Sequence, residues 1–477
     1  MALDSKVPAH TDFTGLRVTV MGLGRFGGGV GAVRFLADRG ALVTVTDLKR
    51  EEDLRDSLQA IDDCSIARLR FGGHDPADFE SADLIVANPA VPPTNEFLRR
   101  AVARHIPIDT EIGLFWRENT APVIAVTGSN GKSTTAAMIH TILTTAGIPC
   151  RFGGNIGISL LPEVDQIRPH EWVVLELSSF QLARLATQRI APQVAVVTEF
   201  SPNHIDWHGT HADYRECKQA ILRFQNVGDT AVLNRDNETW NWPCKSRRLG
   251  FSLSAFEEYG CCVDDGRLTF RSERGVEQFE LPLMTDLPGR HNLQNALAAA
   301  CATWAIDVPG GSIVKAIEHY QPLPHRLQFV GEAAGRKFYN DSLATTPESV
   351  CAALDSFPEP VVLLAGGSDK GVNLTTLARN IVSKTRSVIL MGQTADRLQG
   401  FINREAHGDG PGCVVADSFE AAFRCAVTES QPGDVVLLSP GCASYDWFRD
   451  YEARGSAFVD CVNRWIAEYD PGTERFR

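Results

Sequence analysis

The sequence predicts an α/β protein built from three domains. Short apolar strands alternate with helical segments along most of the chain, which is the pattern of parallel sheets covered by helices. Glycine-rich turns follow two of these strands, one after residue 21 and one after residue 127. The chain of 477 residues is long enough for about three domains of ordinary size.

Composition and charge exclude several classes of protein. The formal net charge of −13 argues against a general binder of nucleic acid or of acidic membranes. The 12 cysteines are scattered without a Cys-x-x-Cys pair, which indicates reduced thiols and not a disulfide framework. No apolar run approaches the length of a membrane span, and Met1–Thr14 lacks the apolar core of a signal peptide. We therefore expect a cytoplasmic protein that neither inserts into a membrane nor binds nucleic acid.

The first domain opens with a βαβ unit. A strand covers Arg17–Met21, a Gly-x-Gly-x-x-Gly turn covers Gly22–Gly27, and a helix then runs to Asp38. A second strand, Ala41–Thr46, precedes Asp47. The glycines allow a diphosphate to approach closely, and Asp47 could accept a hydrogen bond from a ribose. A dinucleotide such as NAD and a UDP-linked group both fit this turn, and a glycine-rich turn without a ligand is the remaining alternative.

A strand, a loop and a polar linker follow. Asn88–Pro93 comes after the strand Asp83–Ala87, at the edge where open parallel sheets bind ligands. The loop is a candidate ligand site, although its residues fit a plain turn equally well. Glu118–Pro122 is polar and contains a proline, so we place a boundary there and assign residues 1–118 to the first domain.

The second glycine-rich turn has the residues of a phosphate site. Val123–Val126 is a short buried strand, Gly128–Gly131 is a turn, and a helix follows. Backbone N–H groups and the positive end of the helix attract phosphate oxygens, Lys132 adds a full charge, and Ser133 or Thr134 can hold Mg²⁺. The spacing departs from the ordinary P-loop, which has glycine at the position of Val126. The alternative is a chance turn before a helix.

Other candidates in the central region are less specific. Three glycines surround Asn155, which indicates close approach to a ligand or an irregular loop. Glu176 lies inside the apolar strand Trp172–Leu177, and because a buried acid is costly unless paired, it is a candidate Mg²⁺ ligand or a salt-bridged core residue. Judged by spacing alone, Lys218 is a solvated helix residue.

A histidine cluster in the same region does not predict a zinc site. His204, His208 and His211 do not match a zincin helix, because Ile205 follows the first histidine where that motif needs glutamate.

The central domain is expected to end with short strands and one helix. Residues 230 to 290 have the pattern of short strands and turns, and an alanine-rich helix covers Arg290–Ala305. Asn292 and Asn295 share a face of that helix, where they could contact an adenine edge or cap the helix. Pro322–Pro324 is a second linker, so residues 119–323 form the central domain.

Residues 324–477 have the pattern of a third α/β domain. Strands are expected at Lys337–Asn340, Val361–Ala365, Ser387–Met391, Cys413–Val415 and Asp434–Leu438. Polar stretches follow three of them: Asn340–Ser342, Gly366–Gly371 and Ser439–Ser444. Such clustering at the carboxyl edge of a sheet is typical of an α/β ligand site, although ordinary turns between strands and helices fit as well.

Taken together, these motifs resemble the Mur ligase family over nearly the whole chain. The phosphate loop, His-Asn-x-x-Asn-Ala at residues 291–296 and Pro-His-Arg at 324–326 mark the superfamily. Glu-Leu-Ser-Ser-Phe-Gln-Leu at 176–182 and Ser-Pro-Gly-Cys-Ala-Ser at 439–444 resemble the glutamate-adding member more specifically. The resemblance implies a Rossmann-like UDP-binding domain, a central P-loop-type ATPase domain and a Rossmann-like C-terminal domain that receives the amino acid.

The resemblance also implies roles for particular residues. The ATP site would contain Gly128, Asn130, Gly131, Lys132, Ser133, Thr134, Asn292, Asn295, Arg326 and Asp341. The UDP substrate would be bound by Gly24, Arg25, Phe26, Asp47, Asn88, Asn155 and Ser178. Two Mg²⁺ sites would use Ser133, Glu176, His204 and a carbamylated Lys218, and catalysis would depend on Lys132, Lys218, His204 and Glu176. Glutamate would contact Thr345, Lys370, Ser444 and Tyr451, although Tyr451 stands where the family usually has phenylalanine.

The implied reaction is ATP-dependent addition of D-glutamate to UDP-N-acetylmuramoyl-L-alanine through an acyl phosphate, in peptidoglycan precursor synthesis, by a monomer. Leu343 replaces the lysine of the family pattern Asn-Asp-Ser-Lys-Ala-Thr-Asn, which leaves the choice between D- and L-glutamate open. The alternatives are a related ligase that adds another residue, such as a folylpolyglutamate ligase, an NAD-dependent oxidoreductase, and a non-enzymatic module that uses ATP as a switch.

Overall fold

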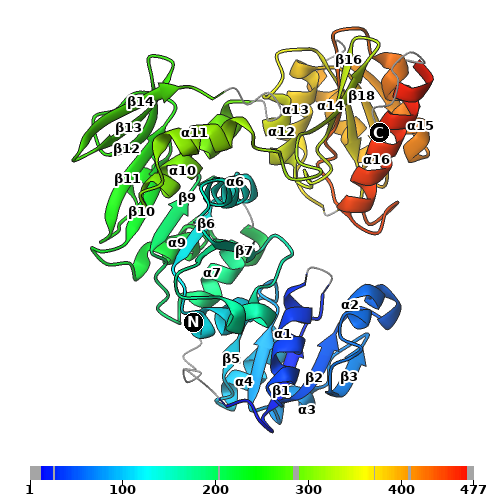
Figure 1. Ribbon diagram of the computed structural model, residues 1–477. Coiled ribbons are helices and arrows are strands. Elements are labelled where there is room, and N and C mark those ends of the chain that lie inside the picture. The colour runs from blue at the N-terminus through cyan, green and yellow to red at the C-terminus, as the bar shows by residue number, and fades with distance from the viewer. Residues whose placement is uncertain are drawn as a thin grey trace. The chain divides into compact units, whose positions relative to one another are not determined.

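Figure 1 shows the computed structural model, which describes residues 12–24, 27–201, 205–282, 289–369, 371–406 and 410–469. Within these ranges the strands form three sheets, each accompanied by helices, so the predicted α/β class is confirmed.

The first sheet is entirely parallel, with the order β3-β2-β1-β4-β5. Its strands are β1 (Arg17–Met21), β2 (Leu42–Asp47), β3 (Ile66–Phe71), β4 (Leu84–Ala87) and β5 (Ile108–Asp109). The order reverses at β1, whose neighbours are β2 on one side and β4 on the other. Open parallel sheets bind ligands at such a point, so the ends of β1, β2 and β4 are where a ligand is expected.

The central sheet has the order β14-β13-β12-β11-β10-β9-β6-β8-β7 and is parallel from β12 to β7. Its strands are β6 (Val123–Thr127), β7 (Cys150–Gly154), β8 (Trp172–Glu176), β9 (Val194–Val197), β10 (Thr230–Asn234), β11 (Arg247–Ser252), β12 (Gly260–Asp264), β13 (Arg267–Ser272) and β14 (Gly275–Glu280). β6, β8 and β9 are buried along nearly their whole length, which explains their continuous apolar runs.

The third sheet has the order β15-β16-β20-β17-β18-β19, and only the β15–β16 pair is antiparallel. Its strands are β15 (Gln328–Ala333), β16 (Arg336–Asn340), β17 (Val361–Gly366), β18 (Thr385–Met391), β19 (Gly412–Val415) and β20 (Val435–Leu438). The polar stretches singled out in the sequence follow β16, β17 and β20, which are neighbours in this order, so the three stretches lie at one edge of the sheet.

Helices connect the strands. Those before residue 120 are α1 (Gly28–Asp38), η1 (Glu51–Asp53), α2 (Arg55–Gln59), α3 (Pro76–Glu80), α4 (Glu96–Ala103) and α5 (Glu111–Glu118). The next are α6 (Lys132–Thr145), η2 (Leu161–Gln166), α7 (Ser179–Leu185), α8 (Ile205–His208), α9 (His211–Arg223), η3 (Glu238–Asn241), α10 (Arg290–Trp304) and α11 (Gly310–Glu318). The last are α12 (Pro347–Leu354), α13 (Thr375–Lys384), α14 (Ala395–Ala406), α15 (Phe419–Glu429) and α16 (Tyr451–Tyr469).

The described residues divide into two compact units. Unit 1 contains the residues up to Pro282 together with Gln294–Glu318, and thus the first two sheets. Unit 2 contains residues 289–293 and those from His319 onward, and thus the third sheet. The division passes through α10.

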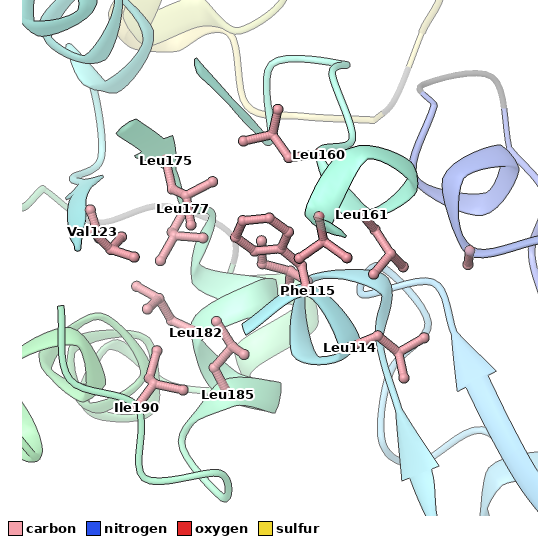
Figure 2. Close-up of a cluster of buried hydrophobic side chains, with 14 of the residues drawn as sticks. Leu114, Phe115, Val123, Leu160, Leu161, Leu175, Leu177, Leu182, Leu185 and Ile190 are labelled. Carbon is pink, nitrogen blue, oxygen red and sulfur yellow. The ribbon is translucent and has the colours of Figure 1, made fainter. Parts of the chain in front are cut away.

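One apolar core joins the two halves of unit 1. Leu114 and Phe115 of α5, which follows the first sheet, belong to the same buried cluster as Leu161 of η2, Leu175 of β8 and Leu182 of α7. Figure 2 shows these side chains together at the junction. The polar linker after Glu118 therefore connects two sheets that share a core.

Candidate active site

The phosphate loop lies between β6 and α6, as the sequence predicts. Gly131 precedes the helix with φ 80°, and a Cβ atom there would lie 2.2 Å from Asn295 Oδ1. A Cβ on Gly128 would lie 1.8 Å from Thr198 Oγ1. Both positions need glycine because the backbone passes too close to these side chains. The Lys132 ammonium donates to the Ser129 carbonyl at 3.0 Å, so the cation stays over the loop.

Residues that the sequence analysis missed support this loop. Glu199 accepts a hydrogen bond from the Asn130 side chain at 2.6 Å, and its carbonyl accepts one from the Ser129 backbone at 2.9 Å. Thr198 Oγ1 donates to the Asn130 carbonyl at 2.5 Å, and the Ser129 hydroxyl lies 3.1 Å from the Tyr214 hydroxyl. The sequence does contain one signal for them. Thr198 and Glu199 are polar residues that directly follow the apolar strand β9, which ends at the same edge of the sheet as β6.

Lys218 is not the solvated helix residue that its spacing indicates. Its side chain is 1% exposed, and Nζ donates to the Gly128 carbonyl at 2.6 Å. Burial, followed by the positive charge of Lys132, lowers the pKa of Lys218 well below its ordinary value. The nearby carboxylates of Glu176 and Glu199 oppose that shift without reversing it. The position thus favours a neutral amine beside the phosphate loop.

Glu176 ends β8 close to the same loop. Its Oε1 accepts a hydrogen bond from Asn155 Nδ2 at 2.9 Å, while Oε2 is buried without a partner among the described residues. The hydroxyl of Thr134 is also buried and has no hydrogen-bond partner among the described residues. Buried polar atoms normally have partners, so these two atoms are candidates for contact with a ligand. The described residues contain no group of three or more His, Cys, Asp or Glu side chains suited to a metal ion.

The predicted UDP site lies at the carboxyl edge of the first sheet. Asp47 is buried, and its carboxylate accepts hydrogen bonds from the backbone N–H groups of Gly24 at 3.1 Å and Lys49 at 2.9 Å. Asn88 lies against the same turn, because a Cβ on Gly22 would be 2.9 Å from its Cβ. The glycine turn, Asp47 and the loop after β4 therefore come together.

Two side chains from helices that follow strands of the central sheet donate hydrogen bonds to the loop after β4. Arg184 of α7 donates through Nη2 to the Val91 carbonyl at 2.8 Å, and Trp207 of α8 donates through Nε1 to the Ala90 carbonyl at 3.0 Å. Ser178 begins α7 with a capping box, in which its hydroxyl accepts from the Gln181 backbone and the Gln181 side chain accepts from the Ser178 backbone. Helices α7 and α8, which follow β8 and β9 of the central sheet, are thus hydrogen-bonded to the loop that follows β4 of the first sheet.

The two asparagines of α10 are both buried. Asn295 lies beside Gly131 of the phosphate loop, within unit 1. Asn292 belongs to unit 2, where burial and the charge of Arg326 lower the pKa of the adjacent His291 to about 4.

In unit 2, Asp341 directly follows β16 and is buried. It accepts hydrogen bonds from the Ser439 hydroxyl at 2.8 Å and the Leu327 backbone at 3.1 Å. Burial raises its pKa to about 7, although these bonds and the charge of Arg326 lower it. Asp341 and Arg326, predicted for the same site, therefore lie close enough to interact electrostatically.

Of the residues predicted to bind glutamate, the three that the structure describes, Thr345, Ser444 and Tyr451, lie in segments at the same edge of the third sheet. Ser444 is buried in the loop after β20, and its carbonyl accepts from the Phe448 backbone at 2.9 Å. Tyr451 begins α16, and its carbonyl accepts from the Ser342 hydroxyl at 2.8 Å. Thr345 and Leu343 are partly buried in the segment after β16, where the Leu343 N–H donates to the His325 carbonyl at 2.9 Å.

Four predicted site residues lie outside the described residues: Arg25, Phe26, His204 and Lys370. No helix within the described ranges is long and apolar enough to span a membrane.

Comparison with known proteins agrees with this arrangement. Residues 16–110 match the N-terminal domain of MurD-like Mur ligases, residues 126–303 the Mur ligase middle domain, and residues 325–442 the Mur ligase glutamate ligase domain. The UDP-N-acetylmuramoylalanine–D-glutamate ligase of Pelotomaculum thermopropionicum is 37% identical, with 94% of this chain and 98% of that protein covered. The enzyme of the same name from Roseiflexus is 38% identical, with 93% and 97% covered.

A solved structure shares the fold at lower identity. The UDP-N-acetylmuramate–alanine ligase of Thermotoga maritima superposes with a TM-score of 0.60 at 18% identity, covering 95% of this chain and 100% of that one. The three domain models occur in order along the chain, and the matched relatives cover nearly its whole length. The chain therefore belongs to the Mur ligase family.

Proposed function

We propose that this chain catalyses the ATP-dependent addition of D-glutamate to UDP-N-acetylmuramoyl-L-alanine, a step in making peptidoglycan precursors. The observation that carries the proposal is the match to relatives named for this activity, which covers more than nine-tenths of both chains. Because the reaction consumes ATP, we place it in the cytoplasm, and we propose that the chain acts as a monomer.

The residues around the phosphate loop fit ATP and Mg²⁺. Lys132 and the N–H groups at the start of α6 supply positive charge, and Asn295 lies beside the loop. Ser133, Oε2 of Glu176, His204 and a modified Lys218 are the proposed metal ligands. Three of them would supply oxygen atoms, which suit Mg²⁺. ATP supplies a phosphoryl group that converts the substrate carboxylate into a better electrophile. Lys132 would stabilise the negative charge that gathers when two anionic groups meet.

Lys218 is proposed to carry a carbamate. A neutral amine attacks the carbon of CO₂, a nitrogen–carbon bond forms, and one proton is released, leaving a carboxylate. The low pKa of the buried Lys218 favours the neutral amine that this step needs. A bare ammonium would repel Mg²⁺, whereas a carbamate attracts it. Protein incubated with ¹³C-bicarbonate should show a carbamate carbon signal by NMR that Lys218→Ala abolishes. Wild-type protein without that signal would contradict the modification.

The remaining assignments follow the three sheets. Residues 1–118 would bind the UDP substrate through Gly24, Arg25, Phe26, Asp47 and Asn88, and Asn155 and Ser178 would contact its muramoyl part. Residues 119–323, which include Asn292, would bind ATP, and Arg326 and Asp341 are proposed to contact the same nucleotide. Residues 324–477 would receive glutamate through Thr345, Lys370, Ser444 and Tyr451.

The test is phosphate release with UDP-N-acetylmuramoyl-L-alanine and each enantiomer of glutamate supplied separately. We expect release only when ATP, the UDP substrate and D-glutamate are all present, because phosphorylation needs the substrate carboxylate. Equal ATP hydrolysis with and without the UDP substrate would contradict the ligase assignment. If product forms with L-glutamate and not with D-glutamate, the proposed stereochemistry is wrong, but the assignment as a ligase holds. NADH should cause no thermal shift, whereas ATP should, which separates this function from that of an oxidoreductase.

A further inference from the structure

Three loops meet at the carboxyl edge of the third sheet. They follow β17, β18 and β20, and the last of them contains Ser444. The loops after β17 and β20 are already joined by backbone bonds, since the Ser368 N–H donates to the Ala443 carbonyl at 2.8 Å. The position of Ser444 therefore depends on what holds these loops together.

One carboxylate contacts both of the other loops. Asp446, two residues after Ser444, accepts a hydrogen bond at Oδ2 from the Gln393 backbone N–H at 3.0 Å. Its Oδ1 lies 3.4 Å from the Ser368 hydroxyl, which donates to it at the long end of the hydrogen-bond range. A single side chain thus connects the segments that follow β17, β18 and β20.

The loop after β18 is shaped around this carboxylate. Gly392 has φ 70°, and a Cβ atom at that position would lie 2.0 Å from Asp446 Oδ2. The backbone of Gln393 leads into α14, a helix of 12 residues, and a negative charge is stabilising near the N-terminus of a helix. The space left by glycine at position 392 and the dipole of α14 therefore both favour a carboxylate at position 446.

Asp446 is part of the turn that begins at Ser444. The Ser444 carbonyl accepts hydrogen bonds from the Trp447 backbone at 3.3 Å and from the Phe448 backbone at 2.9 Å, so residues 444–448 are folded back on themselves. Holding the carboxylate in the middle of this turn also holds its first residue. Without Asp446 the turn would keep its internal bonds and the backbone bond between Ser368 and Ala443, but it would lose the side-chain hydrogen bonds to Ser368 and Gln393.

We propose that Asp446 is a positioning residue for the amino-acid substrate. It fixes Ser444 and the start of the loop after β17 at Ser368, and so sets the affinity for glutamate without contacting it. This inference rests on the proposed function, which assigns Ser444 and Lys370 to the glutamate site.

The first test compares Asp446→Ala with Asp446→Asn. Loss of a charge-assisted hydrogen bond should raise the glutamate KM about tenfold or more in Asp446→Ala. The KM values for ATP and the UDP substrate should stay near those of the wild type, as should kcat at saturating glutamate. Asp446→Asn has a side chain of the same size and keeps an acceptor oxygen. Its glutamate KM should therefore lie between those of the wild type and Asp446→Ala.

A glycine pair supplies the matched control. Gly392→Ala forces a methyl group into the carboxylate and should reproduce the rise in glutamate KM. Gly433 also has a positive φ, 94°, but a Cβ there would have no neighbour within 4 Å. Gly433→Ala should therefore carry a similar backbone strain and leave the glutamate KM unchanged.

The outcomes separate this inference from its premise. A folded Asp446→Ala protein with a wild-type glutamate KM would overturn the positioning role. Equal changes in the KM values of all three substrates, or a fall in thermal stability alone, would show a merely structural contact and overturn it too. A wild-type protein that forms no product with D-glutamate would instead refute the proposed function.

Discussion

At the scale of single residues, the candidate site is marked by two lysine side chains that donate to carbonyls of the phosphate loop. Lys132 and Lys218 approach the same loop, and only the second is fully buried. Lys132→Ala should reduce turnover by a factor on the order of 100 or more, because a preorganised positive donor is lost. The measurement is kcat for phosphate release. Lys245→Ala removes an exposed lysine and should leave kcat unchanged, and an active Lys132→Ala enzyme would contradict the assignment.

Leu343 leads to a second prediction about charge. It stands where the family pattern has lysine, so the glutamate side chain must rely on other partners, of which Lys370 is the only cation among those proposed. Lys370→Ala should therefore raise the glutamate KM steeply. Adding Leu343→Lys to that variant should lower the KM again, since a cation returns to the family position. No recovery in the double variant would mean that the two positions are not interchangeable.

Glu111 gives a pH-dependent prediction. It accepts a hydrogen bond from the Ser159 hydroxyl at 2.5 Å, and burial raises its pKa from 4.5 to about 7. The folded state therefore holds its proton more tightly than the unfolded chain does. The contribution to stability is complete below about pH 4.5 and is lost as the pH rises through about 7.

Glu111→Gln should remove this dependence because glutamine stays neutral. The variant should gain on the order of 1–3 kcal/mol over the wild type at pH 8 and little at pH 4, measured by urea unfolding. Glu277→Gln, at an exposed position, should show no such difference between the two pH values.

At the scale of elements, local patterns predict the strands with long apolar runs and miss those that depend on a neighbour. β6, β8 and β17 are found within a residue or two of their expected ranges, because burial on both faces requires continuous apolar sequence. β7, with the sequence Cys-Arg-Phe-Gly-Gly, has no strand pattern of its own and forms by pairing with β8. Tertiary pairing overrides weak local preference there.

In the candidate site, too, the sequence predicts what is contiguous and misses contacts between residues that are far apart in the chain. Gly128–Lys132 can be recognised from sequence because the turn, the cation and the helix are contiguous. The contact of Asn155 with Glu176 and that of Asn130 with Glu199 join residues 21 and 69 positions apart, and spacing carries no information about them. The burial of Lys218 likewise depends on Gly128, 90 positions earlier.

The capping box of α7 can be tested as an element. Ser178→Ala should destabilise the helix by about 1 kcal/mol, since an N-cap hydroxyl is lost. Ser418 caps α15 in the same way, through the Ala421 backbone, and Ser418→Ala should cost a similar amount. If α7 also positions the substrate, only Ser178→Ala should raise the KM for the UDP substrate. Equal kinetics in the two variants would reduce Ser178 to a purely structural role.

At the scale of the whole molecule, the shared core predicts that the first two sheets unfold together. Phe115 lies at their junction and is fully buried (Figure 2). Phe115→Ala should cost about 3–5 kcal/mol and weaken hydrogen-exchange protection in both β1 and β6. Phe458→Ala, in the core of unit 2, should leave those strands protected. Loss of protection confined to one of the two sheets would contradict a single cooperative unit.

The boundary between the two units inside α10 determines which fragments of the protein can contain a complete unit. Residues 289–293 belong to unit 2, although the stretch Gln294–Glu318, which contains helix α11, belongs to unit 1 and separates them from the rest of unit 2 along the chain. A fragment that starts at the Pro322–Pro324 linker would leave those five residues behind, including His291 and Asn292. Cleavage at that linker would therefore release unit 2 without residues 289–293. A separately expressed C-terminal fragment would need the start of α10 supplied as a peptide to regain the packing of unit 2.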